Sequence, residues 1–145
     1  MNKHVLIALM LLLCSCVQMQ SSSTKVNMAP TLFERIGGLP VLNIVVSETI
    51  DQSVNDPKIK RSFDGIKLST LKQSVVDQFC VLTGGSCVYE GETMQNSHRD
   101  LKITTAEFEL FVEALRTSLN KHVGEREKNE LLKILAPMKR DIVTN

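Results

Sequence analysis

Residues 94–104 contain the side chain best suited to coordination chemistry, His98, which is one of only two histidines that follow residue 16. Imidazole is a common metal ligand and the usual protein ligand of haem iron. A solitary histidine is more often a surface residue or a hydrogen-bonded core residue. The flanking sequence is more informative, because glycine-rich residues 83–91 precede His98 and residues 104–107 predict a helix start after it.

The residues after His98 predict a long amphipathic helix. Thr104 and Glu107 have the spacing of a capping box, in which each side chain accepts a hydrogen bond from the backbone N–H of the other residue. Apolar residues then recur at helical spacing, which predicts a helix over about 105–121. They are Phe108, Phe111, Val112, Leu115 and Leu119. His122 follows, and we interpret it as a surface residue that complements the helix dipole rather than as a metal ligand.

Two helices are expected nearer the N-terminus. Thr31 and Glu34 form a second capping box at the start of a very short helix, which Gly37 and Gly38 end. The next helix should end near residues 55–57, and its inward residues recur at helical spacing. They are Leu42, Val45, Val46, Thr49 and Ile50. Several are β-branched, so a strand is the alternative for this segment.

Two further helices follow from the apolar pattern. One carries a continuous apolar stripe, formed by Leu68, Leu71, Val75, Phe79 and Leu82. In a bundle without a cofactor this stripe would simply be core. The last helix is expected over about 125–142, with Pro137 bending or interrupting it. Its inward residues are Leu131, Leu135, Met138 and Ile142.

Length and composition limit the function classes. A chain of 145 residues allows one domain with a substantial core. The formal net charge is +1, so the composition does not indicate a nucleic-acid partner. Aromatic residues make up 4% of the chain and tryptophan is absent, which argues against a carbohydrate-stacking surface.

Residues 1–16 are interpreted as an export leader. A short basic start precedes the apolar run 5–13, which is too short to span a bilayer as a stable helix. Residues 13–16, Leu-Cys-Ser-Cys, resemble a bacterial lipobox. Cys16 is therefore expected to become the acylated N-terminus of a lipoprotein.

A polar segment, residues 17–30, would then tether the lipid anchor to a domain formed by residues 31–145. We expect a membrane-anchored protein on the periplasmic face, and Val17 after the cysteine favours the outer membrane. The alternatives are cleavage before Cys14, or an ordinary secretory peptide that leaves a soluble periplasmic protein.

Several separated motifs resemble those of group I truncated haemoglobins. They are residues 33–38, Phe63, residues 84–85, residues 89–91, Met94 and His98, in this order. The closing run, residues 125–142, resembles the bacterial branch of that family. The resemblance covers about residues 31–143.

This resemblance implies an all-α fold in which helices are sandwiched two on two around haem b, with His98 as the proximal ligand of the iron. Phe63 would pack against the haem face. The haem contacts that the resemblance implies are Phe63, Leu71, Val75, Phe79, Met94, His98, Ile103 and Phe111. The chain has no Cys-x-x-Cys-His motif, so the haem would be held non-covalently.

The ligand side departs from the family pattern. Many relatives place a tyrosine and a glutamine there as hydrogen-bond donors to dioxygen, whereas an ungapped alignment gives Ile50 and Val75 at those positions. The expected ligand pocket consists of Thr49, Ile50, Phe63, Leu71 and Val75. Each lost hydrogen bond removes about 0.5–1.5 kcal/mol. We therefore expect good binding of CO and NO and fast release of dioxygen.

Cys80 and Cys87 flank the glycine-rich loop, seven positions apart. Export to an oxidising compartment would allow a disulfide between them. Related intracellular globins carry cysteines at similar places, so the alternative is inherited packing without a bridge.

Taken with the resemblance, these residues predict a haem globin that binds diatomic gases for sensing, scavenging or transport. The alternative is an interaction lipoprotein that keeps the globin fold and has lost haem. An enzyme that detoxifies NO would also need bound oxygen and a reductase partner, and the sequence leaves that activity undecided. Peroxidase chemistry is disfavoured because the ligand side lacks an acid–base group.

Overall fold

The computed structural model describes residues 29–144, and regular structure there is helical. Its elements are α1 (Leu32–Ile36), α2 (Gly38–Asn55), η1 (Lys60–Phe63), α3 (Leu68–Leu82), α4 (Met94–His98), α5 (Thr105–His122), α6 (Glu125–Leu135), η2 (Ala136–Met138) and α7 (Lys139–Ile142). In this part of the chain, β pairing is limited to an isolated bridge between Ile103 and Val143. The all-α prediction is confirmed. The leader, Cys16 and most of the tether lie outside the described residues.

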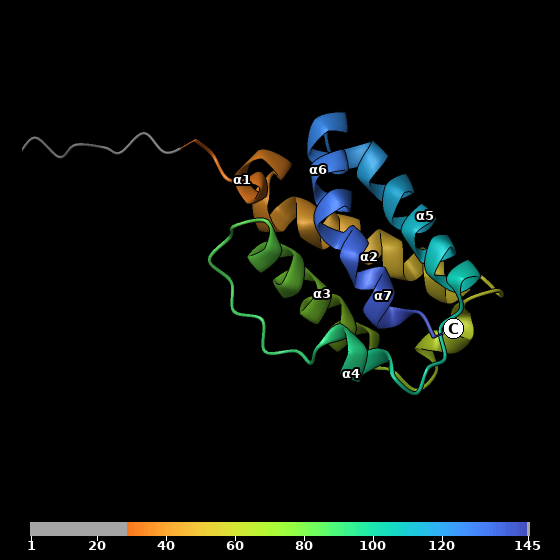
Figure 1. Cartoon of the computed structure of the whole chain (residues 1–145). Helices are drawn as coiled ribbons and strands as arrows, with labels where there is room; N and C mark the ends of the chain where they lie inside the picture. The colour runs from red at the N-terminus through yellow and green to blue at the C-terminus, as the bar shows by residue number, and fades with distance from the viewer. Residues whose placement is uncertain (1–28, 145) are drawn as a thin grey trace, which may run out of the picture.

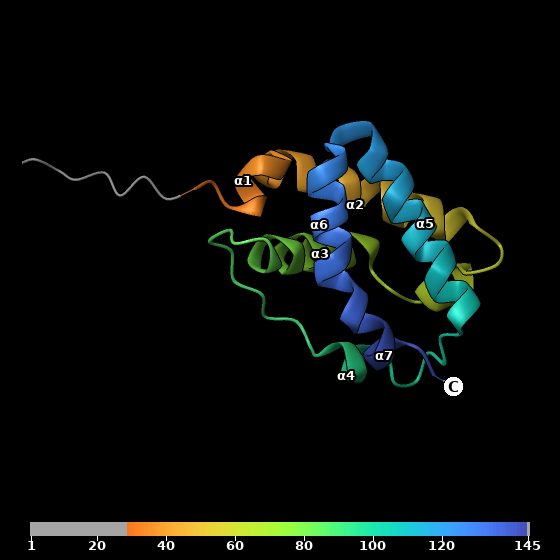
Figure 2. The same ribbon diagram turned by 45° about the horizontal axis from the view of Figure 1, so that its top comes forward.

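The α2 helix is the centre of the fold and packs against both α3 and α5 (Figure 1). The chain turns back after α5, so that α6 runs beside it, and α6 continues through η2 into α7 (Figure 2). The short α1 packs against α6, and the short α4 packs against α7. The α4 helix therefore lies beside α7, away from the α2–α5 contact (Figure 2).

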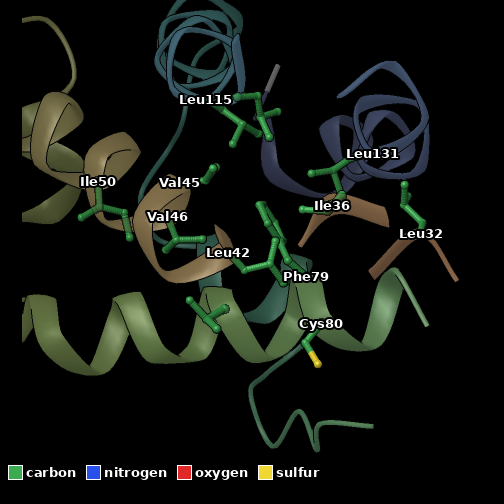
Figure 3. Packing of buried hydrophobic residues seen from close by; sticks show 12 residues of the cluster. Leu32, Ile36, Leu42, Val45, Val46, Ile50, Phe79, Cys80, Leu115 and Leu131 are labelled. Atoms are coloured by element: carbon green, nitrogen blue, oxygen red, sulfur yellow. The ribbon is translucent and has the colours of Figure 1, made fainter. Parts of the chain in front are cut away.

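The core forms where α2 meets its neighbours. Val45, Val46 and Ile50 of α2 form one buried cluster with Phe79 of α3 and Leu115 of α5 (Figure 3). Burying each of these side chains contributes roughly 1.5–3 kcal/mol. This packing outweighs the weak helix propensity of the β-branched residues, so α2 is a helix and the strand alternative is wrong.

The predicted helix ends are also present. Thr31 with Glu34 and Thr104 with Glu107 both form complete capping boxes. Gly37 ends α1 with a φ of 109°, a left-handed conformation that favours glycine. These helix ends could be predicted from the sequence because each depends on a few neighbouring residues.

The last predicted helix, residues 125–142, is interrupted as expected. The α6 helix ends at Leu135, and Pro137 lies in the 3₁₀ turn that separates it from α7. Proline has no N–H to donate, and its ring clashes with the preceding helical turn. The interruption redirects the chain, so that Met138 and Ile142 also reach the cavity described below.

None of the helices among residues 29–144 combines the length and the apolar character that crossing a bilayer requires.

Candidate functional site

A cavity of about 600 Å³ lies between α3, α4, α5 and the α6–α7 segment. Cofactor and ligand sites commonly have volumes of roughly 300–1,000 Å³. All eight residues predicted to contact a haem line this cavity. They are Phe63, Leu71, Val75, Phe79, Met94, His98, Ile103 and Phe111. The fold therefore brings together residues from η1, α3, α4 and α5 and from the loop that precedes α5.

His98 is the last residue of α4, and its side chain is half-buried. Its Nδ1 atom lies 2.8 Å from the Met94 carbonyl oxygen and 3.0 Å from Ser97 Oγ. A carbonyl can only accept, so the hydrogen bond to Met94 places the proton on Nδ1. In the neutral form of the ring the lone pair is then on Nε2, and within residues 29–144 this atom makes no hydrogen bond. This is the tautomer that a metal-ligating imidazole needs, with the second nitrogen oriented by a backbone carbonyl.

The helix that carries His98 depends on local hydrogen bonds, because a five-residue helix is not stable by itself. Thr93 caps it: the Thr93 Oγ atom accepts from the Asn96 N–H at 3.2 Å. The Ser97 hydroxyl donates to the Thr93 carbonyl at 2.9 Å. We call residues 93–104 the His98 segment.

Arg61 ties the far end of the His98 segment to η1. Its guanidinium donates to both carboxylate oxygens of Glu107, at 2.6 and 2.7 Å, and to the carbonyls of Leu101 and Lys102, at 3.0 and 3.1 Å. Lys102 has a φ of 49°, so the backbone there is in the left-handed region. Phe63, two residues after Arg61, lines the cavity. Arg61 therefore connects two walls of the same cavity.

The environment of Glu107 is strongly cationic and rich in donors. The hydrogen bond from Arg61, followed by that from the Thr104 backbone N–H, lowers the pKa of Glu107 to about 2. Glu107 thus serves both as half of a capping box and as the partner of Arg61. The sequence analysis identified the first role and missed the second, because Arg61 and Glu107 are 46 positions apart.

On the other side, Ile50, Leu71 and Val75 line the cavity, and we call these three residues the apolar wall. Their side chains carry no hydrogen-bond donor. Thr49 belongs to a small adjoining space rather than to the cavity itself. Its hydroxyl donates to the Val45 carbonyl at 2.7 Å, which leaves no proton for a ligand.

Gln78 and Tyr89 are polar residues that also line the cavity, and the sequence analysis did not assign either of them to the site. The Tyr89 hydroxyl donates to the Glu92 carbonyl at 2.9 Å, and Gln78 Nε2 approaches Met94 Sδ at 3.6 Å. Gln78 lies on the same α3 face as Leu71 and Val75, so its helical position was the available signal. Tyr89 belongs to the motif at residues 89–91, which was the available signal for it.

A disulfide joins Cys80 of α3 to Cys87 of the loop that leads to α4, with their Cα atoms 5.9 Å apart. Gly85 lies against it: a Cβ atom at this position would be 2.5 Å from Cys80 Sγ. The Gly85 N–H also donates to the Cys80 carbonyl at 2.8 Å. The bridge therefore depends on a turn that only a residue without a side chain allows.

His122 lies away from the cavity lining, at the end of α5. Its Nε2 atom is 2.9 Å from Glu48 Oε1 of α2. Glu48 also accepts from Lys121 at 3.1 Å and from Ser118 at 2.9 Å. The hydrogen bonds from His122, Lys121 and Ser118, in that order, lower the pKa of Glu48 to about 2. His122 thus links α5 to α2.

His98 and the side chains around it in the cavity are suited to bind haem. An imidazole whose Nε2 makes no hydrogen bond suits an axial ligand of iron, and the apolar side chains that line the cavity suit a flat macrocycle. Polar side chains also line the cavity, among them Gln78, Tyr89 and Glu92.

Residues 31–144 match the family model described as bacterial-like globin. A group 1 truncated haemoglobin of Mycolicibacterium paratuberculosis is 29% identical over 115 residues, which cover 79% of this chain and 85% of the relative. Another, from Tetrahymena thermophila, is 23% identical over 113 residues, which cover 77% and 93%.

Solved structures show the same architecture. The truncated haemoglobin of Tetrahymena pyriformis in the Fe(III) form superposes with a TM-score of 0.75 at 21% identity, covering 80% of this chain and 100% of that one. The 2/2 haemoglobin of a Synechococcus species, in the cyanomet state with covalently attached haem, gives 0.74 at 22% identity, with coverage of 80% and 100%. The prediction of a two-on-two truncated globin fold is confirmed.

Proposed function

Because this chain belongs to the bacterial-like globin family, whose members bind haem, we propose that it holds one non-covalent haem b through His98 and binds a diatomic gas on the side of the apolar wall. The observation that carries this proposal is the geometry of His98. Its Nδ1 atom donates to the Met94 carbonyl, and the residue lines a cavity of about 600 Å³ between apolar side chains. When bound, the haem supplies the iron at which a gas can coordinate.

The residues of the proposed site have separate roles. The Met94 carbonyl keeps the His98 ring in one tautomer and orientation, so that Nε2 is available. Phe63, Phe79 and Phe111 enclose the cavity and exclude water. The apolar wall offers no donor, so a strongly polarised ligand such as dioxygen gains little from it. CO, which depends less on such donors, is penalised less.

The test is absorption spectroscopy of purified protein titrated with haemin. Wild-type protein should take up one equivalent and show a Soret band. His98→Ala should lose this band or retain only a weakly held form. His122→Ala is the matched control, because it removes the other imidazole outside the cavity, and it should bind haem as the wild type does.

Two outcomes would contradict the proposal. Unchanged spectra in His98→Ala would mean that another group ligates the iron. Failure of folded wild-type protein to take up haemin would favour the alternative of a haem-free interaction protein.

We also propose that the protein is exported and anchored to a membrane through acylated Cys16. Supporting this are the short apolar run and the lipobox-like residues 13–16, and a Cys80–Cys87 bridge of the kind that persists in oxidising compartments. Mass spectrometry of the mature N-terminus should find acyl groups on Cys16, and Cys16→Ser should abolish them while Cys14→Ser should not. An unmodified N-terminus further along the chain would contradict this proposal and would fit a soluble periplasmic protein.

A further inference from the structure

The chain that leads from α3 into the His98 segment has few noncovalent attachments to the rest of the fold. None of residues 84–92 is buried. Within residues 29–144, residues 86–92 make no backbone–backbone hydrogen bond. Their side-chain bonds are local: the Tyr89 hydroxyl donates to the Glu92 carbonyl, and the Asn96 amide donates to the Glu92 carboxylate at 3.2 Å. These bonds shape the loop without attaching it to another wall of the cavity.

The disulfide supplies that attachment. Cys80 has no exposed surface in the core of α3, and Cys87 packs against the same core. Cys87 lies six positions before Thr93, the residue that caps α4. A crosslink removes the conformations in which the two joined segments separate. The bridge therefore limits how far the start of the His98 segment can move from α3.

The other contacts of α4 are weak or lie elsewhere. No residue of α4 is buried, and the helix packs against α7. From α3, Gln78 Nε2 approaches Met94 Sδ at 3.6 Å, and a thioether sulfur is a weak acceptor. Arg61 holds only the far end of the segment, through the carbonyls of Leu101 and Lys102. On the α3 side, the bridge is thus the main attachment of the helix that carries His98.

We infer that the Cys80–Cys87 disulfide positions His98, and that its reduction makes the protein release haem faster. This inference rests on the proposed haem binding through His98. The Met94 carbonyl orients the imidazole by accepting from Nδ1 at 2.8 Å, and Met94 directly follows the loop that the bridge restrains. Once the S–S bond is broken, α4 can shift away from α3, and the iron-binding nitrogen of His98 loses its fixed direction.

The test uses the full chain loaded with haem and a water-soluble phosphine. The phosphine gives two electrons to the S–S bond and becomes the phosphine oxide, while water supplies the oxygen atom and the two thiol protons. Alkylation and mass spectrometry confirm free thiols at Cys80 and Cys87. Haem transfer from the reduced wild type to an acceptor globin should be roughly tenfold faster, the lower end of the effect of removing a group that orients a metal-ligating imidazole.

Cys87→Ser is the matched control, because it lacks the bridge and leaves the buried Cys80 in place. It should transfer haem as fast as the reduced wild type, and the phosphine should not change its rate. The iron–histidine stretching band of the ferrous protein reports on the bond to His98. This band should shift or broaden in Cys87→Ser and in the reduced wild type alike.

Hydrogen exchange of the haem-free protein separates a local effect from a global one. After reduction, the amides of α4 should exchange faster, whereas those of α2 should keep their protection. Unchanged haem transfer after complete reduction would overturn the inference. An equal loss of protection in α2 and α4 would also overturn it, because the bridge would then stabilise the whole fold. Failure to take up haemin would instead contradict the proposed function, and the exchange of α4 would then decide whether the bridge positions the segment.

Discussion

On one side of the cavity, His98 is carried by a helix of five residues without a buried side chain, whereas on the other side Ile50 belongs to a helix of 18 residues with six buried ones. Hydrogen bonds hold the His98 segment: the cap at Thr93, the Met94 carbonyl on Nδ1 and the Arg61 contacts at its far end. Packing between helices holds the apolar wall.

This difference separates two tasks. The imidazole must point in one direction, and directional hydrogen bonds do this in a segment that buries little apolar surface. The apolar wall must keep its shape and exclude water, which close packing does without directional bonds. Substitutions on the two sides should therefore have different effects. Loss of packing in the apolar wall should lower the free energy of unfolding, and loss of hydrogen bonds in the His98 segment should make haem dissociate faster.

The largest effect on stability is expected from Leu42→Ala. Leu42 has no exposed surface and belongs to the same buried cluster as Ile50. Truncating such a residue costs about 2–5 kcal/mol, through lost burial and the cavity left behind. Urea denaturation of the variant should show this decrease. Leu39→Ala on the same helix is the control, because Leu39 is 41% exposed and its truncation should cost less than about 0.5 kcal/mol.

Ile50→Tyr tests the wall as a source of ligand specificity. It introduces a phenol where the ungapped alignment expects the tyrosine of truncated haemoglobins, and dioxygen release should slow by roughly tenfold, or about 1.4 kcal/mol. Ile50→Phe is the matched control, since it has nearly the same size without the hydroxyl. If wild-type dioxygen release is already as slow as that of Ile50→Tyr, the ungapped alignment of this helix is wrong.

Arg61→Ala should act on haem retention more than on stability. The Arg61 side chain is 52% exposed, so its pairing with Glu107 is screened by solvent and should contribute little to global stability. Loss of its bonds to Leu101 and Lys102 should nevertheless free the end of the His98 segment, and haem transfer to an acceptor globin should become several-fold faster.

Arg35→Ala is the control for this effect, because Arg35 also pairs with two carboxylates, Glu127 and Glu130, but joins α1 to α6. It should lower stability by a similar amount and leave haem transfer unchanged. Equal rates of haem transfer in Arg61→Ala and Arg35→Ala would show that Arg61 only forms a surface ion pair and does not position the His98 segment.

The smallest effect is a dependence of stability on pH. The pKa of Glu107 is lowered from 4.5 to about 2, so its ionised form is favoured by folding. That contribution is complete above pH 4.5 and is lost as the pH falls from there toward 2. Urea midpoints of wild type and Glu107→Gln should therefore converge over this range. A difference that stays constant with pH would mean that the charge of Glu107 is not what stabilises the fold.

Much of the helical framework could be predicted from the sequence. The capping boxes at Thr31 and Thr104, the glycine stop at Gly37 and the break at Pro137 all involve residues within one or two turns of each other. Such signals act through the local backbone, so they operate whatever the rest of the chain does. His98 was found because its flanking motifs also occur in a known family.

Only the tertiary structure decided which side chains meet across the cavity. The pairing of Arg61 with Glu107 and the burial of Ser62 Oγ have no local signature. An arginine or a serine in a short polar turn is solvated unless another element covers it, and what covers it depends on how α2, α5 and the His98 segment pack. The sequence by itself determined the helices and the imidazole, because these depend on near neighbours, whereas long-range packing decided which polar groups face the cavity and which are already paired.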